Sequence, residues 1–188
     1  MLVEAELFVM AEQMLVEVLG RIRDGDRDIA LPPLRTGADP LTMGQAVEQH
    51  RRRDAAVPRL LLGQPADDDA GPPADLGQLA KSACAAAREV QDGDAVVDEQ
   101  GLTARELLLQ ETVVRSLLAH YVAAYLGSTA CPLPEELARP LWAATAPEAE
   151  RWRDLGYFRE PMPLPPHVSC RDRFLLNAGH EPHPLGHP

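Results

Sequence analysis

Aromatic residues, cysteines and strand-forming segments are all scarce in this chain. Phe, Trp and Tyr together make up 4% of the 188 residues, and few segments carry strand signals. The cysteines are Cys84, Cys131 and Cys170, far apart and without a Cys-x-x-Cys pair. This pattern argues against a disulfide-dense scaffold and favours reduced thiols in a cytoplasmic protein.

Long hydrophobic runs and an excess of basic charge are also missing. No segment approaches the about 20 consecutive apolar residues of a membrane span. The first twenty residues carry acidic side chains where a signal peptide needs a basic start and an uninterrupted apolar run. Acidic residues number 29 and basic residues 18, which gives a formal charge of −11. We therefore expect neither a membrane nor nucleic acid as the main partner.

Helical patterns account for most of the chain. Apolar residues at three- and four-residue steps predict the first helix. Capping boxes, Thr42 with Gln45 and Thr103 with Glu106, predict where two further helices begin. The predicted helices span 3–23, 42–63, 76–90, 103–127, 134–146, 146–156 and 171–178.

Four long amphipathic helices with connectors of mixed length predict an all-α fold, a four-helix bundle. We expect a single domain over 1–188, with the bundle core in 1–130 and a C-terminal wrap in 131–188. The wrap contains the extra short helices and a Pro-rich tail. An acidic loop is predicted over 64–75.

His50 and His120 fall inside the second and fourth predicted helices. Histidines on different helices can converge in a bundle core, and neutral imidazoles bind zinc, nickel or iron. The other interpretation is that each is a surface histidine or a hydrogen-bonded core residue. Spacing alone leaves both interpretations open.

Three stretches carry a family resemblance: LTMGQAVEQHRRRDAAVPRLLLG, RSLLAHYVAAYLG and DLGYFREPMPLPPHVSCRDRFLLNAGHEP. Together they resemble the DinB-like (maleylpyruvate isomerase N-terminal domain-like) metal-binding four-helix bundles of actinobacteria. The first is similar to the helix that holds the family's ligand histidine, at His50. The second is similar to R-E-x-x-x-H-x-x-D-x-x-x-G, with matches at Arg115, His120 and Gly127. The third resembles one subfamily's closing segment, with matches at Asp172, Arg173, Leu175, Leu176, Gly179 and Pro182.

The resemblance implies a metal site built on His50 and His120. The family's third ligand is usually a carboxylate or histidine one turn from the histidine on this helix. Here Ser116 stands one turn before His120, and Ala123 stands where aspartate is frequent. Because a serine hydroxyl is a poor ligand, Glu111, Asp54 and His167 are further candidates to complete the site.

The resemblance also implies a function: a transferase or isomerase that uses a divalent metal (zinc or nickel) and a low-molecular-weight thiol such as mycothiol. The expected catalytic residues are His50, His120, Arg115 and Tyr121, acting on a small metabolite. Such bundles often form homodimers, and the oligomeric state stays open.

Two alternatives remain open. One is a metal-free bundle in secondary metabolism, where His50 and His120 act as acid and base in a rearrangement, cyclisation or proton transfer. Tyr121, Tyr125 and Arg115 would orient its substrate. The other is a non-enzymatic bundle that binds a small molecule.

The segment HRRRD has two interpretations as well. Arg51 to Arg53 could meet an anionic thiol or carboxylate substrate, or pair with Glu48 and Asp54 at helical spacing. Three histidines near the C-terminus, His180, His183 and His187, could bind adventitious metal.

Overall fold

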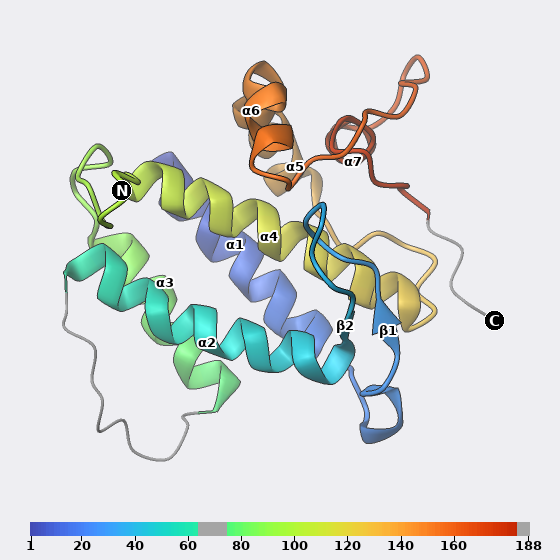
Figure 1. Ribbon diagram of the computed structural model, residues 1–188, viewed down its shortest axis with the longest axis horizontal. Coiled ribbons are helices and arrows are strands. Elements are labelled where there is room, and N and C mark those ends of the chain that lie inside the picture. The colour runs from blue at the N-terminus through green and yellow to red at the C-terminus, as the bar shows by residue number, and fades with distance from the viewer. Residues whose placement is uncertain (64–74, 184–188) are drawn as a thin grey trace.

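The chain is mostly helical in the computed structural model, which describes residues 1–63 and 75–183 (Figure 1). The all-α prediction is confirmed at this level. The helices are α1 (Val3–Leu19), α2 (Met43–Leu62), α3 (Leu76–Glu89), α4 (Ala104–Tyr125), α5 (Glu135–Thr145), α6 (Ala149–Asp154) and α7 (Cys170–Asn177). Short 3-10 turns occupy Asp24–Asp26 and Ala146–Glu148, and two-residue strands β1 (Ala30–Leu31) and β2 (Leu41–Thr42) pair antiparallel. The predicted acidic loop, apart from Asp75, lies outside the described residues.

Local signals explain where most helices begin. Thr42 and Thr103 each accept a hydrogen bond from the backbone N–H three residues on, and both capping boxes form as predicted. The first helix ends at Leu19 and not at Arg23, since Gly20 is followed by the polar segment that forms the first 3-10 turn. Pro58 lies inside α2, which continues to Leu62.

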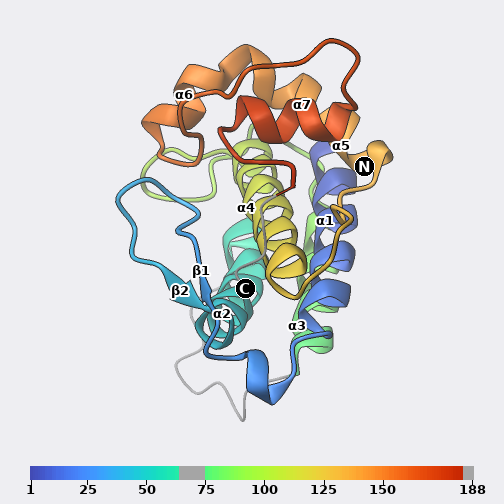
Figure 2. The same cartoon turned by 90° about the vertical axis from the view of Figure 1, so that its right-hand side faces the viewer.

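The four longest helices, α1 to α4, lie side by side (Figure 1). Helix α1 contacts both α4 and α3, and α2 contacts α3. Helices α5, α6 and α7 gather at one side of this group, where α5 contacts both α1 and α7 (Figure 2). Trp152 of α6 and Phe174 of α7 form an aromatic core together with Phe158. All three cysteines carry free thiols.

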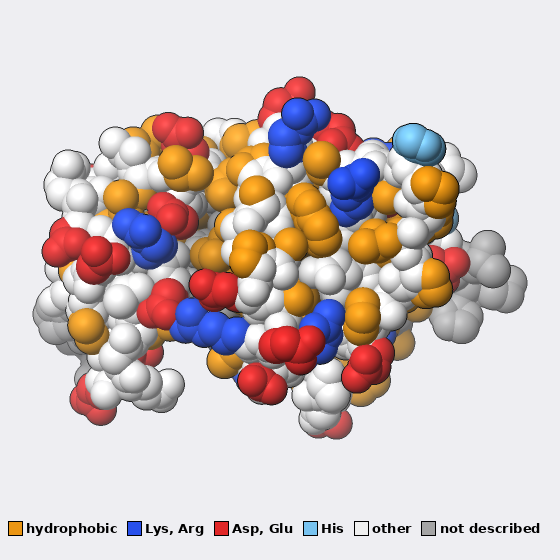
Figure 3. All heavy atoms as spheres, turned by 90° about the horizontal axis from the view of Figure 1, so that it is seen from above, with side chains coloured by type: hydrophobic (Ala, Val, Ile, Leu, Met, Phe, Trp, Pro, Cys, Tyr) orange, Lys and Arg blue, Asp and Glu red, His pale blue; other side chains and the backbone are white. Residues whose placement is uncertain are grey.

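Helix α4 is the most enclosed element, with every residue from Glu111 to Ala124 buried. Buried charged groups are costly unless they find partners, so Glu111 and Arg115 of this helix need partners within α4 or on the helices around it. In the described part of the chain, no helix has the length and apolar character needed to cross a membrane. Acidic and basic side chains are mixed among hydrophobic ones on the face shown in Figure 3.

Candidate metal and acid–base centre

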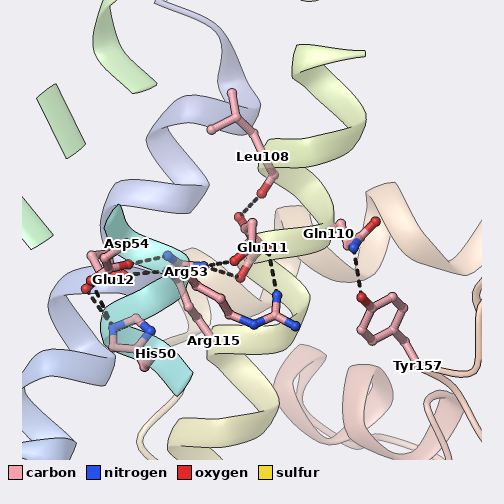
Figure 4. A network of polar contacts seen from close by, with 10 residues as sticks. Glu12, His50, Arg53, Asp54, Leu108, Gln110, Glu111, Arg115 and Tyr157 are labelled. Carbon is pink, nitrogen blue, oxygen red and sulfur yellow. Dashed lines mark hydrogen bonds and ion pairs between the residues drawn. The ribbon is translucent and has the colours of Figure 1, made fainter. Parts of the chain in front are cut away.

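Three side chains from α1 and α2 meet in the interior: Glu12, His50 and Asp54 (Figure 4). His50 Nε2 lies 3.1 Å from Oε1 of Glu12 and 3.2 Å from Oδ2 of Asp54. All three residues are at most 2% exposed. His50 and Asp54 are four residues apart on α2, so both project from one face of that helix. Glu12 comes from the buried side of α1, between Phe8 and Leu15.

Arg115 of α4 organises this cluster. Its Nε donates to Oε2 of Glu12 and its Nη2 donates to Oδ1 of Asp54, both at 2.5 Å. Its Nη1 pairs with Glu111 one turn earlier on α4. The guanidinium also lies 4.4 Å above the ring of Phe8 and is completely buried. Each of the two carboxylates therefore has one oxygen on Arg115 and the other beside Nε2 of His50.

The cluster separates the pKa values of its carboxylates. Burial acts to raise the pKa of Glu12, but the hydrogen bond from His50 and the charge of Arg115 outweigh it and lower that pKa to about 2. Burial raises the pKa of Asp54 to about 6, although His50 and Arg115 act against it. Burial also opposes ionisation of Glu111, but Arg115 and Arg53 lower its pKa. Among the three carboxylates, Asp54 is thus the one that takes a proton most readily.

One more positive charge is needed to balance the cluster. Glu12, Asp54 and Glu111 supply up to three negative charges, and Arg115 and Arg53 supply two positive ones. A proton on His50 or Asp54 would balance the sum, and so would a bound cation. Oδ2 of Asp54 is a buried acceptor that makes no hydrogen bond within the described chain and whose neighbour is Nε2 of His50 at 3.2 Å, so a cation held between these two atoms would satisfy it.

The donor set fits a divalent metal. Zinc binds imidazole nitrogen and carboxylate oxygen at about 2.0–2.2 Å, which in a tetrahedral site places neighbouring ligand atoms about 3.3–3.6 Å apart. The separations of 3.1 and 3.2 Å around His50 Nε2 are slightly shorter, and the contact with Glu12 is a hydrogen bond that a metal would replace. The three ligand atoms all lie within 4.8 Å of one another. One imidazole and two carboxylates suit several divalent ions, so the residues do not select between zinc and nickel.

A cavity of about 250 Å³ adjoins the cluster, between α1, α2, α4 and the loop that joins β1 to β2. His50, Arg53 and Arg115 contribute to its wall. Its apolar lining includes Leu15, Leu31, Leu34, Leu41, Val114 and Leu118. The loop is fastened over it by hydrogen bonds from Thr36 N to Gly156 O and from Arg159 Nη2 to Pro33 O.

His120 and Ser116 do not belong to the group that His50 forms with Glu12 and Asp54. His120 comes five residues after Arg115, about 140° further around α4, and Ser116 comes about 100° further. Nε2 of His120 donates to the carbonyl of Glu181 at 2.8 Å, while its Nδ1 and the hydroxyl of Ser116 have no partner in the described chain. The group that could hold a metal ion in the described chain is Glu12, His50 and Asp54, and the ligand set of His50, His120 and Ser116 stays a prediction.

Tyr121 likewise contacts the C-terminal segment and not the group around His50. Its hydroxyl lies 2.6 Å from Nδ1 of His180, which is 1% exposed. His180 is thus a core residue, and not the exposed metal binder that its position in the sequence predicts. His183 and His167 are exposed, and His187 lies outside the described residues.

The three arginines that follow His50, Arg51 to Arg53, have different partners. Arg51 and Arg52 pair with Glu48, as the helical spacing predicts. Arg53 does not pair with Asp54. It crosses instead to Glu111 on α4, with Nη1 2.6 Å from Oε1, and its side chain is 28% exposed.

Sequence reasoning named Asp54 and Glu111 only as candidates and did not find Glu12. The signals were present: Asp54 follows His50 by one helical turn, and Glu12 interrupts the apolar residues of the first helix. The three- and four-residue steps in the first helix predict a buried stripe that does not include Glu12: Val3, Leu7, Met10, Met14, Val18 and Ile22. Its first member, Val3, is 61% exposed. The true buried face is wider and includes Glu12.

Comparison of the chain with family models, with curated proteins and with solved structures gives no match.

Proposed function

We propose that the chain is an enzyme of the DinB-like four-helix-bundle type, in which Glu12, His50 and Asp54 hold a divalent metal beside a small-molecule cavity. One observation carries the proposal: two carboxylate oxygens and an imidazole nitrogen, from α1 and α2, lie within 4.8 Å of one another in the interior. The expected reaction is transfer or isomerisation on a small metabolite with help from a low-molecular-weight thiol such as mycothiol.

A metal in this position would lower the pKa of a thiol or water. The rest of the chemistry belongs to the chain itself. Arg115 holds Oε2 of Glu12 and Oδ1 of Asp54, so both carboxylates keep their free oxygens turned toward His50. The same guanidinium offsets the repulsion between the two carboxylates. The apolar cavity wall limits water around the reacting group and strengthens each electrostatic contact.

The charge balance favours a second candidate, a metal-free acid–base enzyme on the same residues. A proton on His50 or Asp54 satisfies the cluster as well as a cation does. His50 reaches the cavity and is oriented by Glu12 and Asp54, as a general base is oriented by a carboxylate. The pairing of His50 with His120 as acid and base stays a prediction, since His120 bonds to the C-terminal segment.

Elemental analysis by plasma mass spectrometry separates the two candidates. Tag-free protein purified without chelator is compared with His50→Ala and Asp54→Asn, with the exposed His183→Ala as the matched control. Near-stoichiometric zinc or nickel in the native chain and in His183→Ala, lost from the other two, would support the metal centre. Metal below about a tenth of an equivalent in every sample would reject it.

The metal-free candidate has its own test. Metal-free protein that turns over a substrate, and loses that activity in His50→Gln but not in His183→Gln, would support acid–base chemistry. A chain that binds small molecules in the cavity with no turnover before or after metal loading would point to the binding protein.

A further inference from the structure

The cavity beside His50 is large enough for a ring with a short substituent. A cavity of about 150 Å³ lined by aliphatic and aromatic side chains admits benzene, and this one measures about 250 Å³. Its apolar wall comes from α1, α4 and the proline-containing loop after β1, including Leu15, Pro32, Val114 and Leu118. An apolar body therefore fits better than a sugar or a nucleotide.

Arg53 lines this cavity and is paired with Glu111. Its stem leaves α2 three residues after His50, and its Nη1 is fixed to Glu111 at 2.6 Å. A guanidinium has five N–H donors in a planar fork, and this bond occupies one amino group. Because Glu111 already holds it in place, little side-chain entropy is lost when a ligand binds the other edge.

Arg35 also lines the cavity, from the loop between β1 and β2. Its guanidinium lies 4.9 Å above the ring of Tyr157, and its Nη2 donates to the carbonyl of Leu155 at 2.9 Å. Tyr157 is itself held by a hydrogen bond from Gln110 at 2.8 Å. Two arginines that are both held in place thus border the same apolar space.

With the proposed metal bound, the charges in and behind the cavity wall favour an anion of low charge. Arg35, Arg53 and Arg115 line it, and Asp39 is the acidic residue in that lining. Arg115 is engaged by Glu12, Asp54 and Glu111, which lie behind the wall. Arg53 is paired with Glu111, so the four carboxylates and three guanidinium groups in and behind the wall leave one negative charge. The divalent metal of the proposed function would turn this into one positive charge. That charge suits a single carboxylate, which arginine binds through two parallel hydrogen bonds.

We propose that the cavity takes an apolar monocarboxylic acid, such as a substituted aromatic or alicyclic acid, whose carboxylate is bound by Arg53 and drawn in by Arg35. The apolar body would lie on Val114 and Leu118, with the atoms nearest α2 beside His50. This inference rests on the proposed function, because it assigns the substrate class of the same site.

Binding of simple probes tests it without turnover. Benzoate, benzamide and phenyl phosphate are titrated into ¹⁵N-labelled protein, and dissociation constants and shifted resonances are read by NMR. The expected result is that benzoate shifts cavity residues and binds at least about tenfold tighter than benzamide. Arg53→Gln should remove that preference, and Arg53→Lys should restore part of it. Arg52→Gln is the matched control, since Arg52 is exposed and pairs with Glu48.

The remaining outcomes overturn the inference. They are equal binding of benzoate and benzamide, a preference for phenyl phosphate, an Arg53→Gln variant that keeps native affinity, and no binding of any probe. Folding of each variant is checked by its thermal midpoint. Metal content is measured on the same samples, so failure of the metal centre is seen separately from failure of the acid site. Benzoate binding without metal would keep the substrate class and reject the metal, and the reverse result would do the opposite.

Discussion

Arg115 and Glu12 are 103 positions apart in the chain, and Nε of Arg115 lies 2.5 Å from Oε2 of Glu12. The pair is at most 1% exposed at both side chains. Since the guanidinium takes one oxygen of Glu12, the other oxygen is left facing His50. The buried guanidinium of Arg115 thus stabilises the packing of the helices and also orients Glu12 toward His50.

Replacing Arg115 with Met should lower the free energy of unfolding by about 3–5 kcal/mol, because three buried carboxylates lose their shared partner. Urea denaturation measures the change. Arg21→Met is the control, since its pair with Glu17 is exposed and should matter by less than about 1 kcal/mol. If Arg115→Met loses no more than the control, the network does not stabilise the fold.

Zinc or nickel should stabilise the native chain if Glu12, His50 and Asp54 bind it. At a free metal concentration about 100 times the dissociation constant, binding adds about 2.7 kcal/mol. Thermal melts with and without metal measure this increment, which should vanish in Asp54→Asn and persist in His183→Ala. An equal increment in all three proteins would place the bound metal elsewhere.

Stability should fall as the pH drops below about 6.5 because of His180. Burial is the main cause that lowers the pKa of this imidazole from 6.5 to about 4, and the charge of Arg159 adds to it. Between these values the unfolded chain binds the proton and the folded chain does not. The contribution of His180 to the free energy of unfolding is therefore fully present above pH 6.5 and is lost as the pH falls toward 4. The total loss is at most about 3 kcal/mol.

His180→Phe keeps a ring in this position and cannot be protonated. Its stability should fall less steeply than that of the native chain between pH 6.5 and 4, as read from urea midpoints. Tyr121 and His120 also face this region, so Tyr121→Phe and His120→Phe are measured beside it. An unchanged slope in His180→Phe would assign the pH dependence to other groups.

Thr42→Ala should cost about 1 kcal/mol, because the Thr42 hydroxyl accepts the N–H of Gln45 at the start of α2. Thr42→Ser keeps this acceptor and should be close to native. Denaturation midpoints check both variants, and equal loss in both would show that the hydroxyl does not cap the helix. Since α2 carries His50 and Asp54, the cap also supports the centre.

Gly179→Ala should be strongly destabilising, by more than about 2 kcal/mol. The residue has φ +74°, and an added Cβ would come within 2.6 Å of the carbonyl oxygen of Glu160. The turn there directs His180 into the core. The preceding Ala178 is buried on α7's C-terminal side with φ −76°, and Ala178→Gly serves as the comparison. A native-like midpoint for Gly179→Ala would contradict the close approach.

The helices were largely predictable because their signals are local. Capping by Thr42 and Thr103 and the periodic apolar residues of each segment depend on neighbours within one or two turns. The end of α1 was placed about one turn too late, since apolar Ile22 continues the pattern past Gly20. The four-helix-bundle assignment, the domain division and the family resemblance stay predictions.

The sequence by itself determined that the chain is helical, that His50 and Asp54 share one face of α2, and that Arg115 lies on the long apolar α4. Only the tertiary structure decided that Glu12 joins them, that Arg53 crosses to Glu111 and that His120 turns to the C-terminal segment. The physical reason is distance along the chain. Contacts between Glu12, His50 and Arg115 depend on how α1, α2 and α4 pack and rotate against one another, and helical periodicity does not specify those rotations.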